Sequence, residues 1–368
     1  MRDYFIGLMS GTSSDGVDAA LVEFSPAPRL HTSHFSPYTA ELRAHVLGLA
    51  NGCYGNDAID ELGKLDAELG ETFATAALTV IQASKIERSK IRAIGSHGQT
   101  VRHRPDPPHA FTLQIADPNI IAARCGLTTV ADFRRRDVAL GGQGAPLVPA
   151  FHRAIFADHS ESRVVANIGG IANITLLPKA DGEVSGFDTG PGNVLMDLWS
   201  NQQLHQPHDV NGEFAASGRV DTDLLQLLLA DEYFHRPAPK STGPERFNHH
   251  WLSDKLAGRK LPAADVMATL CELTARSISD AVTLHAPSTK RLLICGGGVH
   301  NRQLLLRLAA RLPGLKLEST EAFGIQPDWV EAVAFAWLAR ETLNARPGNL
   351  PAVTGAREPA VLGAVYHA

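Results

Sequence analysis

Short apolar runs alternate with polar, glycine-rich turns along this chain. Where such a turn joins two apolar runs, the pattern predicts a β-hairpin, once over residues 4–22 and again over residues 163–177. Further strands are predicted at residues 91–95, 111–115, 185–187 and 292–295, and helices at residues 40–49, 59–84, 119–125, 149–156, 194–199, 302–311 and 329–343. Strands that lead into glycine-rich turns and then helices indicate an α/β fold with ligands at the carboxyl ends of its strands.

The turn of the first hairpin combines glycines, hydroxyls and carboxylates in the string GLMSGTSSDGVD at residues 7–18. Glycines let main-chain N–H groups approach an anion, hydroxyls add hydrogen-bond donors, and carboxylates can hold a cation beside it. The turn is therefore a candidate phosphate site, with Asp15 and Asp18 as candidate Mg²⁺ ligands. The alternative for these two acids is a local role in shaping an ordinary hairpin turn.

A second turn of this kind, NIGGIAN at residues 167–173, suggests that the chain contains duplicated domains. Each domain would offer one turn to a shared phosphate, and 368 residues suffice for two domains of moderate size. We expect an N-terminal domain over residues 1–140, completed by the C-terminal segment, and a C-terminal domain over residues 141–368. The cleft between them is the expected ligand site, and glycines at residues 141–146 would permit closure at the junction.

Composition narrows the class of protein. Apolar residues make up 44% of the chain, charged residues 20%, and the net charge is -5, which is typical of a soluble globular protein and favours neither a nucleic acid nor a membrane as partner. No apolar run approaches the roughly 20 residues that span a bilayer. The cysteines at positions 53, 125, 271 and 295 lack CxxC spacing and no leader opens the chain, so we expect a reduced cytoplasmic protein with buried thiols.

Asp188 is the first candidate for catalysis. It ends a predicted strand and precedes the turn TGPGN at residues 189–193, so its side chain should point outward. Such a carboxylate can act as a general base or hold a Mg²⁺-bound water. The alternative is that Asp188 caps the helix that begins near Val194, although Asn193 is the more natural cap.

Candidate ligand-binding residues also lie outside the hairpin turns. His97 stands in a predicted loop over residues 96–100 whose Gly, Ser and Gln neighbours suit a sugar, although a lone His is more often a structural donor. The arginines at residues 134–136 form a run that is usually a solvated face, yet one guanidinium of the three could bind a substrate carboxylate. Glu331 lies in an apolar helix and faces either solvent or the ligand site.

Two more strings resemble parts of nucleotide sites. The glycines at residues 296–298 separate a strand from a helix, so a nucleotide could lie flat on their backbone, or the helix could simply cross the strand closely. The string KSTG at residues 240–243 looks like a phosphate-binding sequence but lacks a preceding strand, which favours a plain loop. No Walker or dinucleotide-binding motif occurs in a suitable strand–helix context.

The strings at residues 7–18, 95–100, 131–137, 167–170 and 186–193 together resemble the signatures of the anhydro-N-acetylmuramic acid kinase family. The resemblance runs from end to end and implies an α/β fold of two RNase-H-like domains, as in actin, Hsp70 and sugar kinases, with an interdomain active-site cleft. It also implies a cytoplasmic enzyme, often a homodimer, that acts in peptidoglycan recycling. Such an enzyme uses ATP, Mg²⁺ and water to convert 1,6-anhydro-N-acetylmuramic acid into N-acetylmuramic acid 6-phosphate.

The resemblance implies roles for single residues as well. Asp188 matches the catalytic base, and His97, Arg134 and Glu331 match sugar-binding positions. The implied ATP-binding residues are Gly11, Thr12, Ser13, Ser14, Asp15, Gly16, Val17, Asp18, Asn167, Gly169, Gly170, Gly296, Gly297 and Gly298. Two rival functions fit a doubled fold: a sugar kinase that phosphorylates an ordinary hydroxyl or carboxylate, and a nucleotide-driven binding protein, for which we would expect a partner-binding module.

Overall fold

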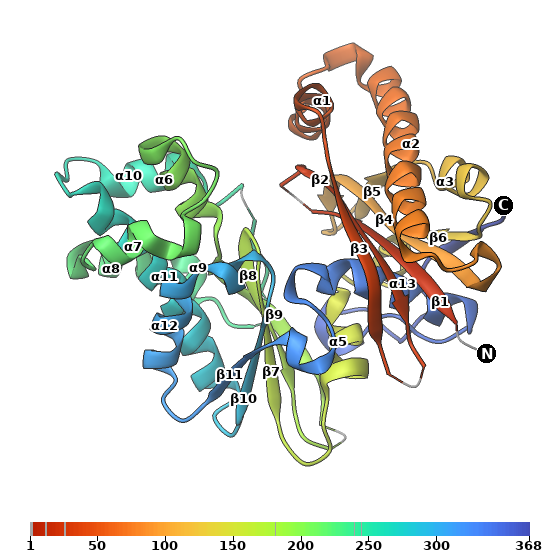
Figure 1. Cartoon of the computed structure of the whole chain (residues 1–368). Coiled ribbons are helices and arrows are strands. Elements are labelled where there is room, and N and C mark those ends of the chain that lie inside the picture. Colours follow the sequence, from red (N-terminus) through yellow and green to blue (C-terminus); the bar gives the residue numbers. More distant parts are fainter. Residues whose placement is uncertain (1–2, 12, 26, 181, 239, 244) are drawn as a thin grey trace. The chain divides into compact units, whose positions relative to one another are not determined.

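The computed structural model describes residues 3–11, 13–25, 27–180, 182–238, 240–243 and 245–368. The chain forms two compact units, which can be followed by their colours in Figure 1. Unit 1 comprises Met1–Ile155 and Gly324–Ala368, and unit 2 comprises Phe156–Phe323. Each unit is built on one mixed β-sheet with helices packed against it, which confirms the predicted α/β class.

The sheet of unit 1 has the strand order β12-β6-β4-β1-β2-β3, and β5 pairs with β4 outside that path. Its strands are β1 (Tyr4–Ser10), β2 (Gly16–Glu23), β3 (Arg29–Pro37), β4 (Ile91–Arg104), β5 (Phe111–Ile115), β6 (Thr129–Ala131) and β12 (Ala364–Tyr366). The predicted β1–β2 hairpin is confirmed, and β3 extends it as a third antiparallel strand. Strands β1, β4 and β6 run parallel. The turn after β1 therefore lies at the same sheet edge as the residues that follow β6.

Helices cover both faces of this sheet. Alternate residues of β1 point to opposite faces: Ile6 and Leu8 share a core with α2, whereas Gly7 backs onto α13, where an added methyl group would collide with the Ala332 carbonyl. Helix α13 therefore packs directly on the strand backbone and joins the C-terminal segment to unit 1. The helices of this unit are α1 (Ala40–Asn51), α2 (Ala58–Ser84), α3 (Pro118–Cys125), α4 (Arg135–Ala139), α5 (Val148–Phe156), α13 (Val330–Leu343) and α14 (Pro351–Thr354).

The sheet of unit 2 has the order β11-β10-β7-β8-β9. Strands β7, β8 and β9 form an antiparallel meander, and β10 and β11 continue parallel to β7 on its other side. The path β6-β4-β1-β2-β3 of unit 1 has the same order and directions, so the duplication predicted from the two hairpins is confirmed. The strands of unit 2 are β7 (Arg163–Ile168), β8 (Ile171–Leu177), β9 (Ser185–Pro191), β10 (Arg291–Cys295) and β11 (Lys316–Ser319).

The helices of unit 2 share one core with its sheet. Val164 and Ala166 of β7 are fully buried there with residues of α11 such as Leu270. Val165 between them is also buried but does not belong to this core, as the two-residue period of a strand predicts. The helices are α6 (Val194–Leu204), α7 (Glu213–Ser217), α8 (Thr222–Leu229), α9 (Glu232–His235), α10 (His249–Leu256), α11 (Ala263–His285) and α12 (Arg302–Arg311), of which α12 has the bounds that the sequence predicts.

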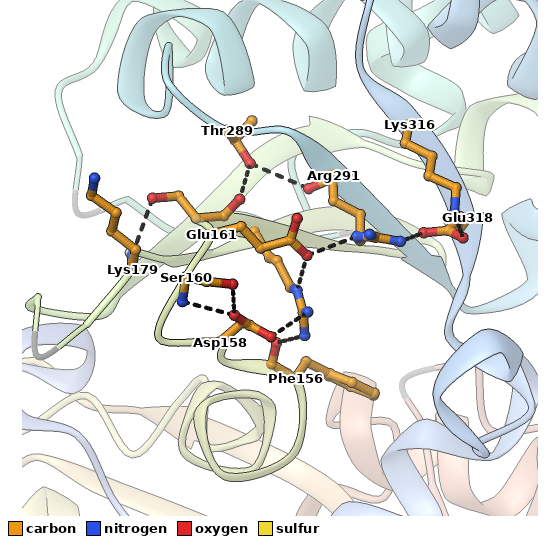
Figure 2. Close-up of polar contacts among 11 residues, drawn as sticks. Phe156, Asp158, Ser160, Glu161, Lys179, Thr289, Arg291, Lys316 and Glu318 are labelled. Atoms are coloured by element: carbon orange, nitrogen blue, oxygen red, sulfur yellow. Dashed lines mark hydrogen bonds and ion pairs between the residues drawn. The ribbon is translucent and has the colours of Figure 1, made fainter.

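The first and last residues of unit 2, Phe156 and Phe323, both contact Arg163. Figure 2 labels three partners of this arginine, Phe156, Asp158 and Glu161. The Arg163 guanidinium donates to the Phe156 carbonyl at 2.8 Å and forms ion pairs with Asp158 and Glu161, each at 2.7 Å. The same guanidinium lies 4.9 Å from the ring centroid of Phe323. The rings of Phe156 and Phe323 meet edge to face with centroids 5.9 Å apart. The two ends of unit 2 are therefore neighbours.

The predicted domain junction at residues 141–146 lies inside unit 1. The Gly144 N–H donates to the buried Asp137 carboxylate at 2.8 Å, and the Gln143 N–H donates to the Thr354 carbonyl at 2.7 Å. These bonds fix the glycine-rich segment to α4 and to the C-terminal part of the same unit. The compact units divide after Ile155 and Phe323 instead of at residue 140.

Two features bear on the class of protein. No helix within the described residues has the length and apolar character that crossing a bilayer requires. The thiols of Cys125, Cys271 and Cys295 are buried, as predicted, whereas Cys53 is exposed.

Candidate active site

The first glycine-rich turn joins β1 to β2 and is held from beneath by a polar network. Ser14 has φ 48°, and its N–H donates to the Gly11 carbonyl at 3.2 Å. Gln99 on β4 donates to the same carbonyl at 3.2 Å and accepts the Ser10 hydroxyl at 2.7 Å. The turn is thus fixed to the sheet. Of the other residues predicted here, Thr12 lies outside the described residues, and the start of β2 buries Gly16 and Val17.

Acidic side chains gather beside this turn. Asp18 on β2 is half-buried, and its burial, together with the carboxylates of Glu331, Asp15 and Asp328, raises its pKa to about 7. Glu331 lies in the first turn of α13, and its charge acts on Asp18, so it belongs to the same acidic cluster. Asp15 is exposed and accepts the Ser13 hydroxyl at 2.7 Å. Near neutral pH, Asp18 therefore favours a proton or a cation beside it.

Arg134 and His97 contact each other directly. Residues 96–100 form part of β4 instead of the predicted loop, because a bulge near Gly98, whose φ is 75°, fits an extra residue against β1. The Arg134 Nε donates to His97 Nε2 at 2.9 Å and its Nη1 donates to the Gly144 carbonyl at 2.8 Å. His97 Nδ1 donates to the Gly98 carbonyl at 2.8 Å. Burial and the Arg134 charge hold the pKa of His97 well below its usual value, so the imidazole is neutral.

Of the three arginines at residues 134–136, Arg134 is the one that turns toward His97. Arg135 pairs with Asp132 at 2.7 Å and its side chain is 61% exposed, and Arg136 is exposed as well. Burial lowers the pKa of Arg134 to about 10, and the Glu331 carboxylate opposes this shift. Arg134 remains a cation near neutral pH and is the candidate partner for a ligand carboxylate.

The glycine-rich turns of unit 2 meet at one edge of its sheet, because β7, β9 and β10 run in the same direction. The Asn193 N–H donates to the Gly169 carbonyl at 2.8 Å. Asn193 occupies the predicted cap position of α6, yet its side chain donates to the Ile168 carbonyl at 3.1 Å instead of capping the helix. Gly296, with φ 78°, and Gly298 both lie against Ile168. The structure thus brings together the predicted residues Asn167, Gly169, Gly170, Gly296, Gly297 and Gly298.

Asp188 lies on β9, beside the segment at residues 240–243. Its N–H donates to the Lys240 carbonyl at 3.0 Å, and its Oδ2 accepts the Thr242 N–H at 3.0 Å. Its carbonyl accepts the Tyr233 hydroxyl at 2.6 Å. Burial raises the pKa of Asp188 to about 6, against the effect of the Thr242 hydrogen bond. The result is a desolvated carboxylate that is ionised near neutral pH and can accept a proton.

The chain matches one known family from end to end. A sequence profile described as AnmK: Anhydro-N-acetylmuramic acid kinase matches residues 3–368. The chain belongs to the anhydro-N-acetylmuramic acid kinase family. It is therefore a kinase that uses ATP.

Relatives match this kinase over its full length. The anhydro-N-acetylmuramic acid kinase of Xanthomonas axonopodis pv. citri (strain 306) is 54% identical over 368 residues, covering 99% of this chain and 98% of the relative. That of Coxiella burnetii (strain Dugway 5J108-111) is 51% identical over 367 residues, covering 99% and 98%. Among solved structures, the activator of the 2-hydroxyisocaproyl-CoA dehydratase from Clostridium difficile with bound ADPNP aligns with a TM-score of 0.47 at 11% identity, covering 93% of this chain and 97% of that one.

In unit 2 of the kinase, a cavity of about 320 Å³ opens beside Gly297. It contains Asp197, whose pKa is raised to about 7 by burial and by the Asp209 carboxylate. A polar cavity next to a glycine-rich turn is a candidate site for the nucleoside part of ATP. The other lining residues are Asn193, Met196, His208, Val210, Asn211, His300 and Asn301.

The kinase offers carboxylates for Mg²⁺ in unit 1. Among the described residues, no three His, Cys, Asp or Glu side chains form a metal-binding group by themselves. Mg²⁺ in phosphoryl-transfer enzymes is commonly held by one or two carboxylates together with phosphate oxygens and waters. Asp15 and Asp18 fit this pattern, since the half-buried Asp18 carboxylate lies among other negative charges.

Sequence reasoning missed several residues that shape the site. Tyr38 donates to the Ser10 hydroxyl at 3.1 Å beneath the first turn, and Tyr233 and Thr242 bind Asp188. The KSTG string was a signal for Thr242, because its glycine and hydroxyl residues suggest that an anion binds there. The anion that Thr242 binds in this structure is the Asp188 carboxylate. Nothing in the local pattern marks Tyr233, whose partner is 45 residues away.

Proposed function

We propose that this kinase phosphorylates 1,6-anhydro-N-acetylmuramic acid on O6 with ATP while water opens the 1,6-anhydro bridge, giving N-acetylmuramic acid 6-phosphate and ADP. The observation that carries the proposal is the family match over residues 3–368. The desolvated Asp188 carboxylate supports it, since the reaction requires a general base. The product would feed peptidoglycan recycling.

One carboxylate can suffice for this reaction. Asp188 takes a proton from water as the water oxygen bonds to C1 and the C1–O6 bond breaks. O6 then bonds to the γ-phosphorus of ATP as the bond from phosphorus to the ADP oxygen breaks. An inverting glycosidase needs a second carboxylic acid to protonate its leaving group. Here the phosphoryl group takes the place of that proton.

Unit 1 supplies the sugar-binding side of the proposal. Arg134 is oriented by His97 and can bind the lactyl carboxylate of the sugar through two hydrogen bonds. Both nitrogens of His97 are already engaged, so we assign it to orienting Arg134. Glu331, which faces the same cluster, can accept a hydrogen bond from a sugar hydroxyl.

The glycine-rich turns supply the ATP-binding side. We propose that residues 11–18, 167–170 and 296–298 bind the phosphates through main-chain N–H groups, and that the cavity beside Gly297 receives the nucleoside. Asp15 and Asp18 would hold Mg²⁺, which supplies positive charge to the transferring phosphoryl group. We also propose a cytoplasmic homodimer, a state that sedimentation at equilibrium would test.

The deciding experiment is turnover of the purified kinase with MgATP and 1,6-anhydro-N-acetylmuramic acid in ¹⁸O-labelled water, with the sugar product weighed by mass spectrometry. A phosphorylated sugar that carries one heavy oxygen would establish ring opening by water coupled to phosphoryl transfer. A phosphorylated sugar without it would favour an ordinary sugar kinase. ADP without a phosphorylated sugar would favour a nucleotide-driven binding protein.

A further inference from the structure

The segment at residues 240–243 runs beside β9 like the start of an extra parallel strand. The Asp188 N–H donates to the Lys240 carbonyl at 3.0 Å. In a regular parallel ladder, the next bond would run from the N–H of the residue two positions later, Thr242, to the Asp188 carbonyl. That bond is replaced in this structure by two others.

Tyr233 donates a hydrogen bond to the Asp188 carbonyl, and Thr242 donates one to the Asp188 carboxylate. The Tyr233 hydroxyl donates to the Asp188 carbonyl at 2.6 Å, in the place of the missing ladder donor. The Thr242 N–H, left without its ladder acceptor, donates to Asp188 Oδ2 at 3.0 Å. The Thr242 N–H therefore bonds to the side chain of Asp188, whereas in a regular ladder it would bond to the Asp188 main chain.

The Tyr233 ring is held firmly enough to keep this arrangement. It is fully buried and packs edge to face on Phe247 with ring centroids 5.6 Å apart. The Lys240 ammonium lies 4.8 Å from the ring centroid and donates to the Tyr233 carbonyl at 3.1 Å. Lys240, whose carbonyl accepts the Asp188 N–H, is thus anchored to Tyr233, whose hydroxyl donates to the Asp188 carbonyl.

We infer that Tyr233 is a positioning residue. Because its hydroxyl occupies the Asp188 carbonyl, the Thr242 N–H donates to the Asp188 carboxylate instead, which orients that carboxylate and favours its ionised form. The inference rests on the proposed role of Asp188 as general base. A hydrogen bond to the ionised carboxylate favours that form and fixes the direction of its free oxygen. Without the Tyr233 hydroxyl, the Asp188 carbonyl would recapture the Thr242 N–H and release the side chain.

Charged groups around Asp188 also affect the ionisation of its carboxylate. Glu245, three positions after Thr242 in the sequence, raises the pKa of Asp188. Lys240, Arg236 and Arg246 bring positive charge to the Tyr233 side of the segment. These charges are unchanged by Tyr233→Phe, so a shift in that variant reports the hydrogen bonds.

The test compares Tyr233→Phe with the wild type in the pH dependence of kcat/KM for the sugar. Removing the hydroxyl should move the acidic limb of the kcat/KM profile to higher pH by about one unit. The reason is that the ionised Asp188 carboxylate loses a hydrogen-bond donor. We expect kcat to fall roughly tenfold with little change in the KM for ATP. The matched control is Tyr54→Phe, which removes another tyrosine hydroxyl bonded to a main-chain carbonyl, that of His45 at 3.5 Å, and should keep the wild-type limb.

A second pair of variants tests the donor itself. Thr242→Pro removes the main-chain N–H and should raise the limb as Tyr233→Phe does, whereas Thr242→Ala keeps the N–H and the wild-type limb. This pair decides the matter if Tyr233→Phe fails to fold. A wild-type limb in a folded Tyr233→Phe or Thr242→Pro enzyme would overturn the inference. A wild-type enzyme that does not phosphorylate the sugar would overturn the proposed function instead.

Discussion

The guanidinium of Arg134 donates a hydrogen bond from Nε to Nε2 of His97 at 2.9 Å. Because His97 Nδ1 donates to the Gly98 carbonyl, the neutral imidazole can accept the Arg134 hydrogen bond at its other nitrogen. The histidine therefore serves as an acceptor that orients an arginine. Because this acceptor is neutral, it orients the guanidinium without pairing with its charge, and the carboxylates that act on that charge are those of Glu331 and Asp137.

Arg134→Gln should raise the KM for the anhydro-sugar by roughly 10- to 100-fold, since a charge-assisted pair with the lactyl carboxylate is lost. An analogue without the lactyl group should lose much less. Arg135→Gln is the matched control, because Arg135 is exposed and pairs with Asp132, and it should leave the KM near the wild-type value. Equal losses for the sugar and its analogue would contradict the assignment.

Asp188→Asn should lower kcat by at least about a hundredfold and leave the affinity for ATP nearly unchanged, because the change keeps the volume and removes the base. In the wild type, kcat/KM should fall as pH drops through about 6, where Asp188 takes up a proton. Residual turnover of the variant should lack that limb. Isothermal titration with a nonhydrolysable ATP analogue checks binding; near-normal rates in the variant would remove Asp188 from the mechanism.

Asp18→Asn should stabilise the ligand-free enzyme at about pH 8 by roughly 1–3 kcal/mol. The pKa of Asp18 is raised from its usual 3.8 to about 7, so the folded state binds the proton more tightly than the unfolded chain. Its ionisation therefore costs stability as pH rises between these values, and the gain from Asn should vanish at low pH. Urea unfolding at both pH values measures this. The exposed Asp15 offers the control Asp15→Asn, and an equal gain there would refute the role of burial.

Gly296→Ala should raise the KM for ATP at least about tenfold, since its Cβ would lie 2.8 Å from the Ile168 carbonyl oxygen and separate the turn at residues 296–298 from that at residues 167–170. Gly314→Ala is the control, because Gly314 has a similar φ of 86° and open space around it. Both variants strain the backbone alike. If their KM values for ATP match, contact between the turns is not what ATP binding requires.

The sequence predicted the elements that depend on local pattern. Both hairpins and α12 (Arg302–Arg311) follow from apolar periodicity and turn chemistry. Contacts between distant segments were missed, because no local pattern encodes them. Tyr233 reaches Asp188 only where α9 and the segment at residues 240–243 pack on β9. The bulge near Gly98 depends on the register in which β4 pairs with β1.

The cluster around Arg163 has a consequence for how the kinase is encoded. Since Phe156 and Phe323 touch, the whole of unit 2 enters and leaves at a single point of the chain path. Unit 2 is thus one uninterrupted stretch of sequence between the two parts of unit 1, which a short bridge from Ile155 to Gly324 would make continuous. Separating the two units in the coding sequence therefore takes two cuts, after residues 155 and 323, that lie close together in space.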